Sequence, residues 1–215
     1  MKLAVFDCDG TLVDGQAAVC EAMELAFASA GLPAPARHDV RRIVGLSLPQ
    51  AVRHLAPDAP LERQVAAVEG YKAAFRASRE EGRLEEPLFE GMDALLRTLA
   101  ADGWTLAVAT GKSDRGLAAC LAGHGIADLF VSLQTADRHP SKPHPAMVTE
   151  CCDEAGMAPR ETIVIGDAIY DMQMAKAAGA TAIGVAWGYA NPDELWKAGA
   201  DAVVERPADL LAYIH

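Results

Sequence analysis

The sequence predicts an α/β fold, in which a parallel sheet carries helices on both faces and a helical segment is inserted near the N-terminus. From residue 87 onward, short apolar runs alternate with amphipathic segments, a pattern typical of repeated strand–helix units. An earlier apolar run at residues 3–6 has the length and composition of a strand buried on both faces. Residues 15–87 contain no strand-like run, so they separate the first strand from the rest. The 215 residues are enough for one domain with such an insertion.

The inserted segment is expected to hold four helices. Apolar residues recur at helical spacing from residue 16 to residue 30, and Gly31 and Pro33 end the pattern. The other three helices are expected over residues 39–44, 49–55 and 61–79, the last of them long, charged and amphipathic.

After the insertion, the predicted elements alternate between helix and strand. Strands are expected over residues 104–109, 129–133, 162–165, 181–185 and 202–204. Helices are expected over residues 91–101, 114–123, 145–155, 169–178, 192–198 and 207–214. Because sites in open parallel sheets form at the carboxyl ends of the strands, polar residues that directly follow a predicted strand are the first candidates for function.

Charge and cysteine content narrow the class of protein. A formal net charge of −11 argues against nucleic acid or an anionic membrane as the main partner. Five cysteines without CxxC spacing are expected to be reduced cytosolic thiols, with Cys151 and Cys152 as small apolar residues of a helix. Two early aspartates interrupt any signal peptide, and no apolar run approaches the length of a membrane span, so we expect a cytoplasmic protein.

The first polar cluster follows the first strand. Asp7 and Asp9 lie two residues apart, so in an extended chain their side chains point the same way and can serve one site. Gly10 permits an abrupt turn beside a ligand, because it can adopt backbone angles that a side chain forbids. Two neighbouring carboxylates at a buried strand end repel each other, and a metal ion or a shared proton would relieve that repulsion.

Two further clusters suit an anion. Thr110 and Gly111 follow a predicted strand, where a hydroxyl and free amides at a helix N-terminus can bind phosphate oxygens; a simple helix cap is the alternative. Lys142 lies in a loop stiffened by Pro143 and Pro145, and its ammonium group is a compact charge suited to phosphate.

The last cluster suits a cation. Asp167 and Asp171 lie four residues apart where a predicted strand passes into a helix, and such a pair can share Mg²⁺, which prefers oxygen ligands. Acidic residues also complement the dipole of a helix N-terminus, but that alternative accounts for one aspartate better than for two.

Together, the four clusters resemble motifs I to IV of the haloacid dehalogenase-like hydrolases, in order and at strand ends. The matching stretches are Asp7-Cys8-Asp9-Gly10-Thr11-Leu12, Thr110, Lys142 and Gly166-Asp167-Ala168-Ile169-Tyr170-Asp171. The resemblance covers the whole chain and implies a Rossmann-like core over residues 1–14 and 88–215, with a helical C1 cap over residues 15–87. Ala168 departs from the Thr or Ser of many relatives, but no carboxylate is lost there and we expect activity to persist.

The resemblance also implies roles for these residues. Asp7 would be the nucleophile that forms an aspartyl-phosphate, and Asp9 would be the general acid and then the general base. The resemblance further implies a Mg²⁺ site formed by Asp7, the Asp9 backbone carbonyl, Asp167 and Asp171. It also implies a phosphate-binding site formed by Asp7, Thr110, Gly111 and Lys142.

The substrate is less constrained by the sequence. The dehalogenases that this chain resembles lack an aspartate at the position of Asp9, so its presence here favours phosphate esters as substrates. The stretch from Arg41 to Leu48 looks most like the phosphoglycolate phosphatases, which suggests a small phosphorylated metabolite. The residues of this stretch that we expect to set specificity are Arg42, Gly45, Leu46 and Ser47. Arg41 or Arg42 could reach a substrate carboxylate, and a solvated helix face is the alternative for both.

Two other functions are compatible with the fold that the sequence predicts. A β-phosphoglucomutase-like mutase is disfavoured by Leu48, because such relatives usually carry Arg there. A non-catalytic regulator of the same fold should have lost a nucleophile or a metal ligand, whereas every carboxylate of the motifs is present. The sequence is compatible with a monomer or a homodimer.

Overall fold

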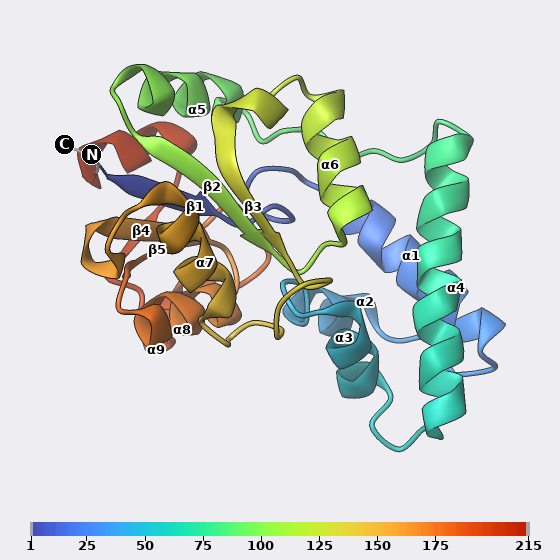
Figure 1. The fold of residues 1–215 in the computed structure, drawn as a ribbon. Coiled ribbons are helices and arrows are strands. Elements are labelled where there is room, and N and C mark those ends of the chain that lie inside the picture. The colour runs from blue at the N-terminus through green and yellow to red at the C-terminus, as the bar shows by residue number, and fades with distance from the viewer. Residues whose placement is uncertain (1, 214–215) are drawn as a thin grey trace.

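A computed structural model describes residues 2–213 and confirms the α/β fold class. Six strands form one sheet in the order β3-β2-β1-β4-β5-β6, and every neighbouring pair is parallel (Figure 1). The strands are β1 (Leu3–Phe6), β2 (Thr105–Thr110), β3 (Phe130–Thr135), β4 (Thr162–Gly166), β5 (Thr181–Val185) and β6 (Ala202–Val204).

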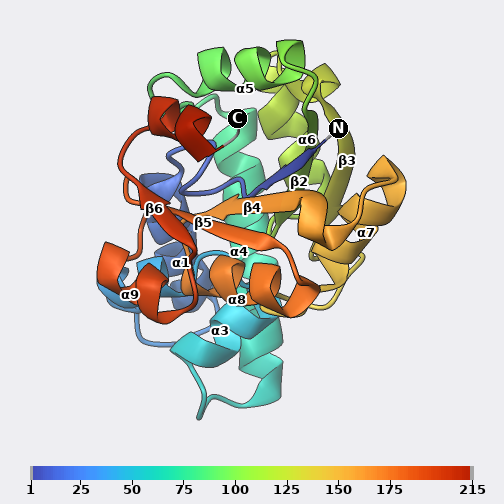
Figure 2. The same cartoon turned by 90° about the vertical axis from the view of Figure 1, so that its left-hand side faces the viewer.

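The central strand β1 explains the two-sided core. All four of its residues are fully buried, and their side chains alternate between two apolar layers. Ala4 and Phe6 pack on the face covered by α5 (Met92–Ala101), α6 (Asp114–Gly123) and the 3₁₀ helix η3 (Pro207–Tyr213). Leu3 and Val5 pack on the face covered by α7 (Ala146–Ala155), α8 (Ile169–Ala178) and α9 (Pro192–Lys197) (Figure 2).

The inserted helices have a core of their own. They are α1 (Gln16–Ser29), α2 (Arg37–Arg42), α3 (Leu48–Leu55) and α4 (Leu61–Glu80), and α1 packs mainly against α4. Phe27 is buried at the centre of this third apolar cluster, together with residues from the other three helices. Figure 1 shows these helices beyond the arrowheads of β2 and β3, at the carboxyl edge of the sheet.

Several boundaries differ from the prediction for identifiable reasons. Strand β2 continues to Thr110 and β3 to Thr135, because these two residues pair in register at the ends of the strands. The expected last helix is a 3₁₀ segment that ends at Tyr213, and residue 214 lies outside the described residues. The predicted place of Cys151 and Cys152 is confirmed, since both are buried thiols of α7. None of the described helices is both long and apolar enough to cross a membrane.

Candidate functional site

The site is built where three adjacent strands end. Asp7 directly follows β1 and Asp167 directly follows β4, while Thr110 is the last residue of β2. The Asp7 amide donates to the Ile165 carbonyl at 2.9 Å, which continues the β1–β4 ladder by one step. Because β1 lies between β2 and β4, the three polar residues meet at one edge of the sheet, as the strand pattern predicts.

A tight turn after β1 brings the motif against Asp167. The amides of Leu12 and Val13 both donate to the Cys8 carbonyl, at 2.9 and 3.1 Å. Gly10 has φ +84°, and a Cβ built there would collide with the Asp167 carboxylate, so both backbone angle and space require glycine. The turn ends with the Thr11 hydroxyl donating to Asp167 Oδ1 at 3.0 Å.

Three buried carboxylates converge beside this turn. One ligand atom from each of Asp7, Asp167 and Asp171 lies within 4.8 Å of the others. Burial raises the pKa of Asp167 well above its ordinary value, and the charges of Asp7 and Asp171 raise it further. Asp7 Oδ2 is buried without a hydrogen-bond partner among the described residues. A cation that prefers oxygen ligands would offset the repulsion among the three carboxylates and would give Asp7 Oδ2 a partner. The cluster therefore fits a divalent metal such as Mg²⁺.

Lys142 is the positive charge of the cluster. Its fully buried ammonium nitrogen lies 2.9 Å from Asp7 Oδ1 and 2.6 Å from Asp171 Oδ1. Burial lowers the pKa of Lys142, but the charges of Asp171 and Asp7 outweigh it and raise that pKa above its ordinary value. Burial has the opposite effect on an acid and raises the pKa of Asp171 to about 6, although the charge of Lys142 opposes this rise. Lys142 is therefore held charged between two carboxylates.

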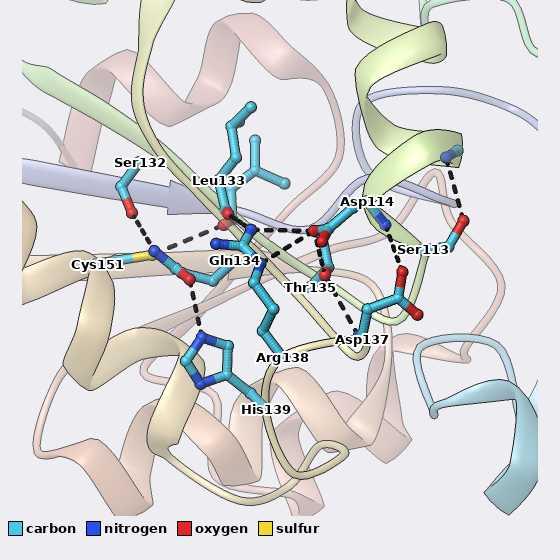
Figure 3. A network of polar contacts seen from close by, with 12 residues as sticks. Ser113, Asp114, Ser132, Leu133, Gln134, Thr135, Asp137, Arg138, His139 and Cys151 are labelled. Atoms are coloured by element: carbon cyan, nitrogen blue, oxygen red, sulfur yellow. Dashed lines mark hydrogen bonds and ion pairs between the residues drawn. The ribbon is translucent and has the colours of Figure 1, made fainter.

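The loop that carries Lys142 is fixed by a polar network between β3 and the start of α6 (Figure 3). The Thr135 hydroxyl donates to Asp114 Oδ1 at 2.7 Å, and the Asp114 amide donates to Asp137 Oδ2 at 2.9 Å. Further along the same loop, His139 Nε2 lies 2.8 Å from the Gln134 side-chain oxygen. These bonds tie the loop to the segment that follows Thr110, so the two candidate phosphate-binding stretches are positioned together.

The Asp9 side chain takes a different direction from that of Asp7. Its Oδ1 lies 2.9 Å from the Lys112 ammonium, which also lies 2.5 Å from Glu86 Oε1. Burial raises the pKa of Asp9 above its ordinary value, and Glu86 adds to the rise while Lys112 opposes it. Lys112 and Glu86 were not among the site residues predicted from the sequence. Lys112 offered a signal two residues beyond Thr110, whereas Glu86 lies in an irregular segment without any motif.

The segment between α2 and α3 reaches the same edge of the sheet. The Ser47 amide donates to the Ser141 hydroxyl at 2.7 Å, next to Lys142. A Cβ built at Gly111 would lie 2.6 Å from the Leu46 carbonyl oxygen and 2.8 Å from that of Gly45. The structure thus brings the predicted residues Gly45, Leu46 and Ser47 to the site, and it packs them closely on the segment after β2.

Ala168 lies beneath this contact. A Cβ built at Gly45 would be 3.4 Å from the Ala168 Cβ, which is ordinary contact distance. The Ala168 amide donates to Asp171 Oδ2 at 3.0 Å, so the backbone at this position orients the carboxylate without a hydroxyl side chain.

A cavity of about 510 Å³ opens between the inserted helices and the sheet edge. Asp7, Asp9 and Thr110 line its inner end. Arg42 is not brought to this cavity, because its exposed guanidinium forms an ion pair with Glu194 of α9 at 2.8 Å. Arg41 is likewise exposed and not among the lining residues.

Comparison with known proteins supplies the family context. Residues 4–185 match the model of a family described as haloacid dehalogenase-like hydrolase. The chain is 35% identical to the probable phosphatase IndB of Dickeya dadantii, over 99% of this chain and 93% of that one. It is 30% identical to a phosphoglycolate phosphatase of Thiobacillus denitrificans, over 97% and 93%. A hydrolase from Pseudomonas syringae has a similar structure, with a TM-score of 0.88, 26% identity and coverage of 100% and 98%.

Proposed function

Because the chain belongs to the haloacid dehalogenase-like hydrolases, we propose that it is a Mg²⁺-dependent phosphatase that acts through an aspartyl-phosphate on a small phosphorylated metabolite. Curated relatives named as phosphatases, aligned over nearly the whole chain, support the phosphatase class. The observation that carries the proposal is the buried cluster of Asp7, Asp167 and Asp171, with the Lys142 ammonium between Asp7 and Asp171. This cluster offers a nucleophile, a cation site and a fixed positive charge within one small volume.

Asp7 and Asp9 divide the chemistry between them. An Asp7 carboxylate oxygen attacks phosphorus, and the bond from phosphorus to the leaving alcohol oxygen breaks. Asp9 donates its proton to that oxygen, and its raised pKa suits this role. Asp9 then takes a proton from water, whose oxygen attacks the aspartyl-phosphate; phosphate leaves and the Asp7 carboxylate is restored.

The remaining residues bind and orient charge. Asp7, Asp167, Asp171 and the Asp9 backbone carbonyl would hold Mg²⁺, which supplies positive charge against the phosphoryl oxygens. Lys142 offsets further negative charge from the buried end of the site, and Thr110 and Gly111 offer a hydroxyl and an amide to the phosphoryl group. Preorganised groups of this kind need little rearrangement as charge develops in the transition state.

The insertion over residues 15–87 acts in this proposal as a cap. Its Ser47 amide and the neighbouring carbonyls already contact the sheet edge, and its helices form one wall of the cavity. Closure of such a wall excludes bulk water from the phosphoryl group during transfer. The substrate class that we propose is a phosphoglycolate-type monoester, for which relatives named phosphoglycolate phosphatase, such as that of Thiobacillus denitrificans, are the support.

The direct test is phosphate release from a panel of phosphorylated metabolites that includes 2-phosphoglycolate, measured with Mg²⁺ and with EDTA. We expect Mg²⁺-dependent release from at least one monoester, and no release in EDTA. A sugar bisphosphate requirement would instead identify a mutase. A folded, metal-loaded protein that hydrolyses no member of the panel would contradict a phosphatase function.

Lys112 offers a second prediction, because it holds the proposed general acid in place. Lys112→Met removes the partner that Asp9 and Glu86 share, so we expect kcat/KM for an alkyl phosphate to fall roughly 10–100-fold. This ratio reports formation of the aspartyl-phosphate and not its later hydrolysis, in which Asp9 acts as the base. An aryl phosphate with an acidic leaving group needs little proton donation, so its kcat/KM should fall much less. Lys197→Met, in an exposed lysine of α9, is the control. Equal losses of kcat/KM for both leaving groups would show that Lys112 does not support Asp9 as the general acid.

A further inference from the structure

We infer that the substrate carries a second anionic group on its leaving alcohol, and that Arg76, Arg79 and Arg115 bind this group at the outer part of the cavity. The inference rests on the proposed function and adds a substrate subsite to it. Arg76 and Arg79 come from α4 of the insertion, and Arg115 comes from the first turn of α6. All three line the same cavity as Asp7 and Asp9.

The arginines share a direction because of their places on the helices. Positions 72, 76 and 79 of α4 follow helical spacing, so their side chains lie along one face of that helix. Figure 1 shows α4 as the long helix on the outer side of α1 and α6. Since residues 113, 115 and 116 also line the cavity, α4 and α6 supply basic residues to one space.

The three guanidinium groups also have no acidic partner. Within residues 2–213, no carboxylate oxygen lies within 4.0 Å of Arg76, Arg79 or Arg115. Two lysines also line the cavity, and both are paired: Lys72 with Glu69, and Lys112 with Glu86 and Asp9. In a chain of net charge −11, three unpaired arginines around one cavity favour an anionic ligand.

A continuous wall links the reacting end of the cavity to these arginines. The Lys112 ammonium, 2.9 Å from Asp9, lies 5.7 Å from the centre of the Phe75 ring. Phe75 packs on Tyr71 with ring centres 4.9 Å apart and the rings tilted by 33°, and Arg79 lies one helical turn beyond Phe75. A leaving group that extends from phosphorus past Asp9 therefore follows the Phe75 ring toward the arginines.

The volume and the charged lining residues of the cavity are compatible with such a leaving group. Its volume of about 510 Å³ lies within the range of whole-ligand sites, so it has room for a leaving group of several carbon atoms beyond the phosphoryl group. Asp137 is the remaining acidic lining residue, and its Oδ2 already accepts the Asp114 amide. A carboxylate or a second phosphate has the chemistry that planar guanidinium groups bind in a bidentate manner. 2-Phosphoglycolate is the shortest member of this substrate class.

The test compares matched pairs of monoesters. Phosphoryloxy carboxylic acids with two to five carbon atoms are assayed beside alkyl phosphates of the same length, and alkanediol bisphosphates provide the second-phosphate arm. For wild type we expect kcat/KM to be about tenfold or more higher for the anionic member of at least one pair. The double variant R76Q/R79Q and the single variant R115Q should each raise KM for that member about tenfold, and raise KM for the alkyl phosphate of the same length by much less.

The control is Arg53→Gln, which removes an arginine of α3 that does not line the cavity. Equal kcat/KM for anionic and alkyl monoesters at every length would overturn the subsite, as would an anionic preference that survives both arginine variants. Because the alkyl phosphates report hydrolysis by themselves, their turnover separates failure of the subsite from failure of the phosphatase function. A preference in the bisphosphate arm alone would assign the second anion as phosphate, and one in the acid arm alone would assign it as carboxylate.

Discussion

Asp7→Asn is expected to reduce phosphate release roughly 10⁴-fold or more, because a neutral amide cannot replace the carboxylate that we propose as the nucleophile. The substitution keeps the shape of a side chain that is only 2% exposed. It also removes one of three clustered negative charges, so the fold should be retained. The measurement is phosphate release with saturating Mg²⁺, and a thermal melt of the same sample checks the fold.

The matched control lies in the same segment of chain. Asp14 is exposed, and its carboxylate accepts only a 3.3 Å bond from the Gln16 amide among the described residues. Asp14→Asn should therefore change kcat/KM by no more than about twofold. If folded Asp7→Asn kept a tenth or more of wild-type activity, another group would have to be the nucleophile.

The core of the site was predictable because strand position fixes it. Asp7 and Asp167 each follow a buried apolar strand, and parallel neighbours end at the same edge, so spacing alone places their carboxylates together. Thr110 was predictable for the same reason, because it ends the neighbouring strand β2. Lys142 lies in a loop, but its place between prolines in the order of the motifs was enough to select it.

The rest depends on packing that a sequence pattern does not contain. Glu86 meets Asp9 through Lys112, although it belongs to the irregular segment that leads back from α4 to the sheet. The sequence offered Arg41 or Arg42 for a substrate carboxylate, with a solvated helix face as the alternative, and the docking of α2 directs Arg42 to Glu194. Arg76 and Arg79 belong to a helix that was predicted only as long, charged and amphipathic, and their helical spacing does not reveal that they line the same cavity as Asp7 and Asp9.

Residues at the sheet edge and residues of the inserted helices are expected to control different properties, namely the chemical step and the substrate preference. The sheet edge holds buried, mutually paired groups whose geometry leaves little freedom. The inserted helices present half-buried aromatic rings and unpaired arginines, which a substrate can contact without breaking an existing bond. Chemistry should therefore follow the sheet edge, and substrate preference should follow α4 and α6.

Lys142→Met should lose activity and also lower the free energy of unfolding by about 3–5 kcal/mol, because it leaves Asp7 and Asp171 buried without their positive partner. Methionine fills a similar volume, so the loss reports charge and hydrogen bonding more than packing. Lys176→Met is a control of the same chemistry, since Lys176 pairs with Asp201 at 2.8 Å, close to the 2.6 Å between Lys142 and Asp171.

The two lysine pairs differ chiefly in burial, and burial decides the expected result. The side chains of Lys176 and Asp201 are 46% and 43% exposed, whereas those of Lys142 and Asp171 are fully buried. Water screens the exposed pair, so Lys176→Met should cost only about 0–1 kcal/mol and leave activity intact. Urea unfolding of both variants in EDTA gives the comparison without metal. A loss for Lys142→Met as small as that for Lys176→Met would mean that the three carboxylates do not need this lysine to stay folded together.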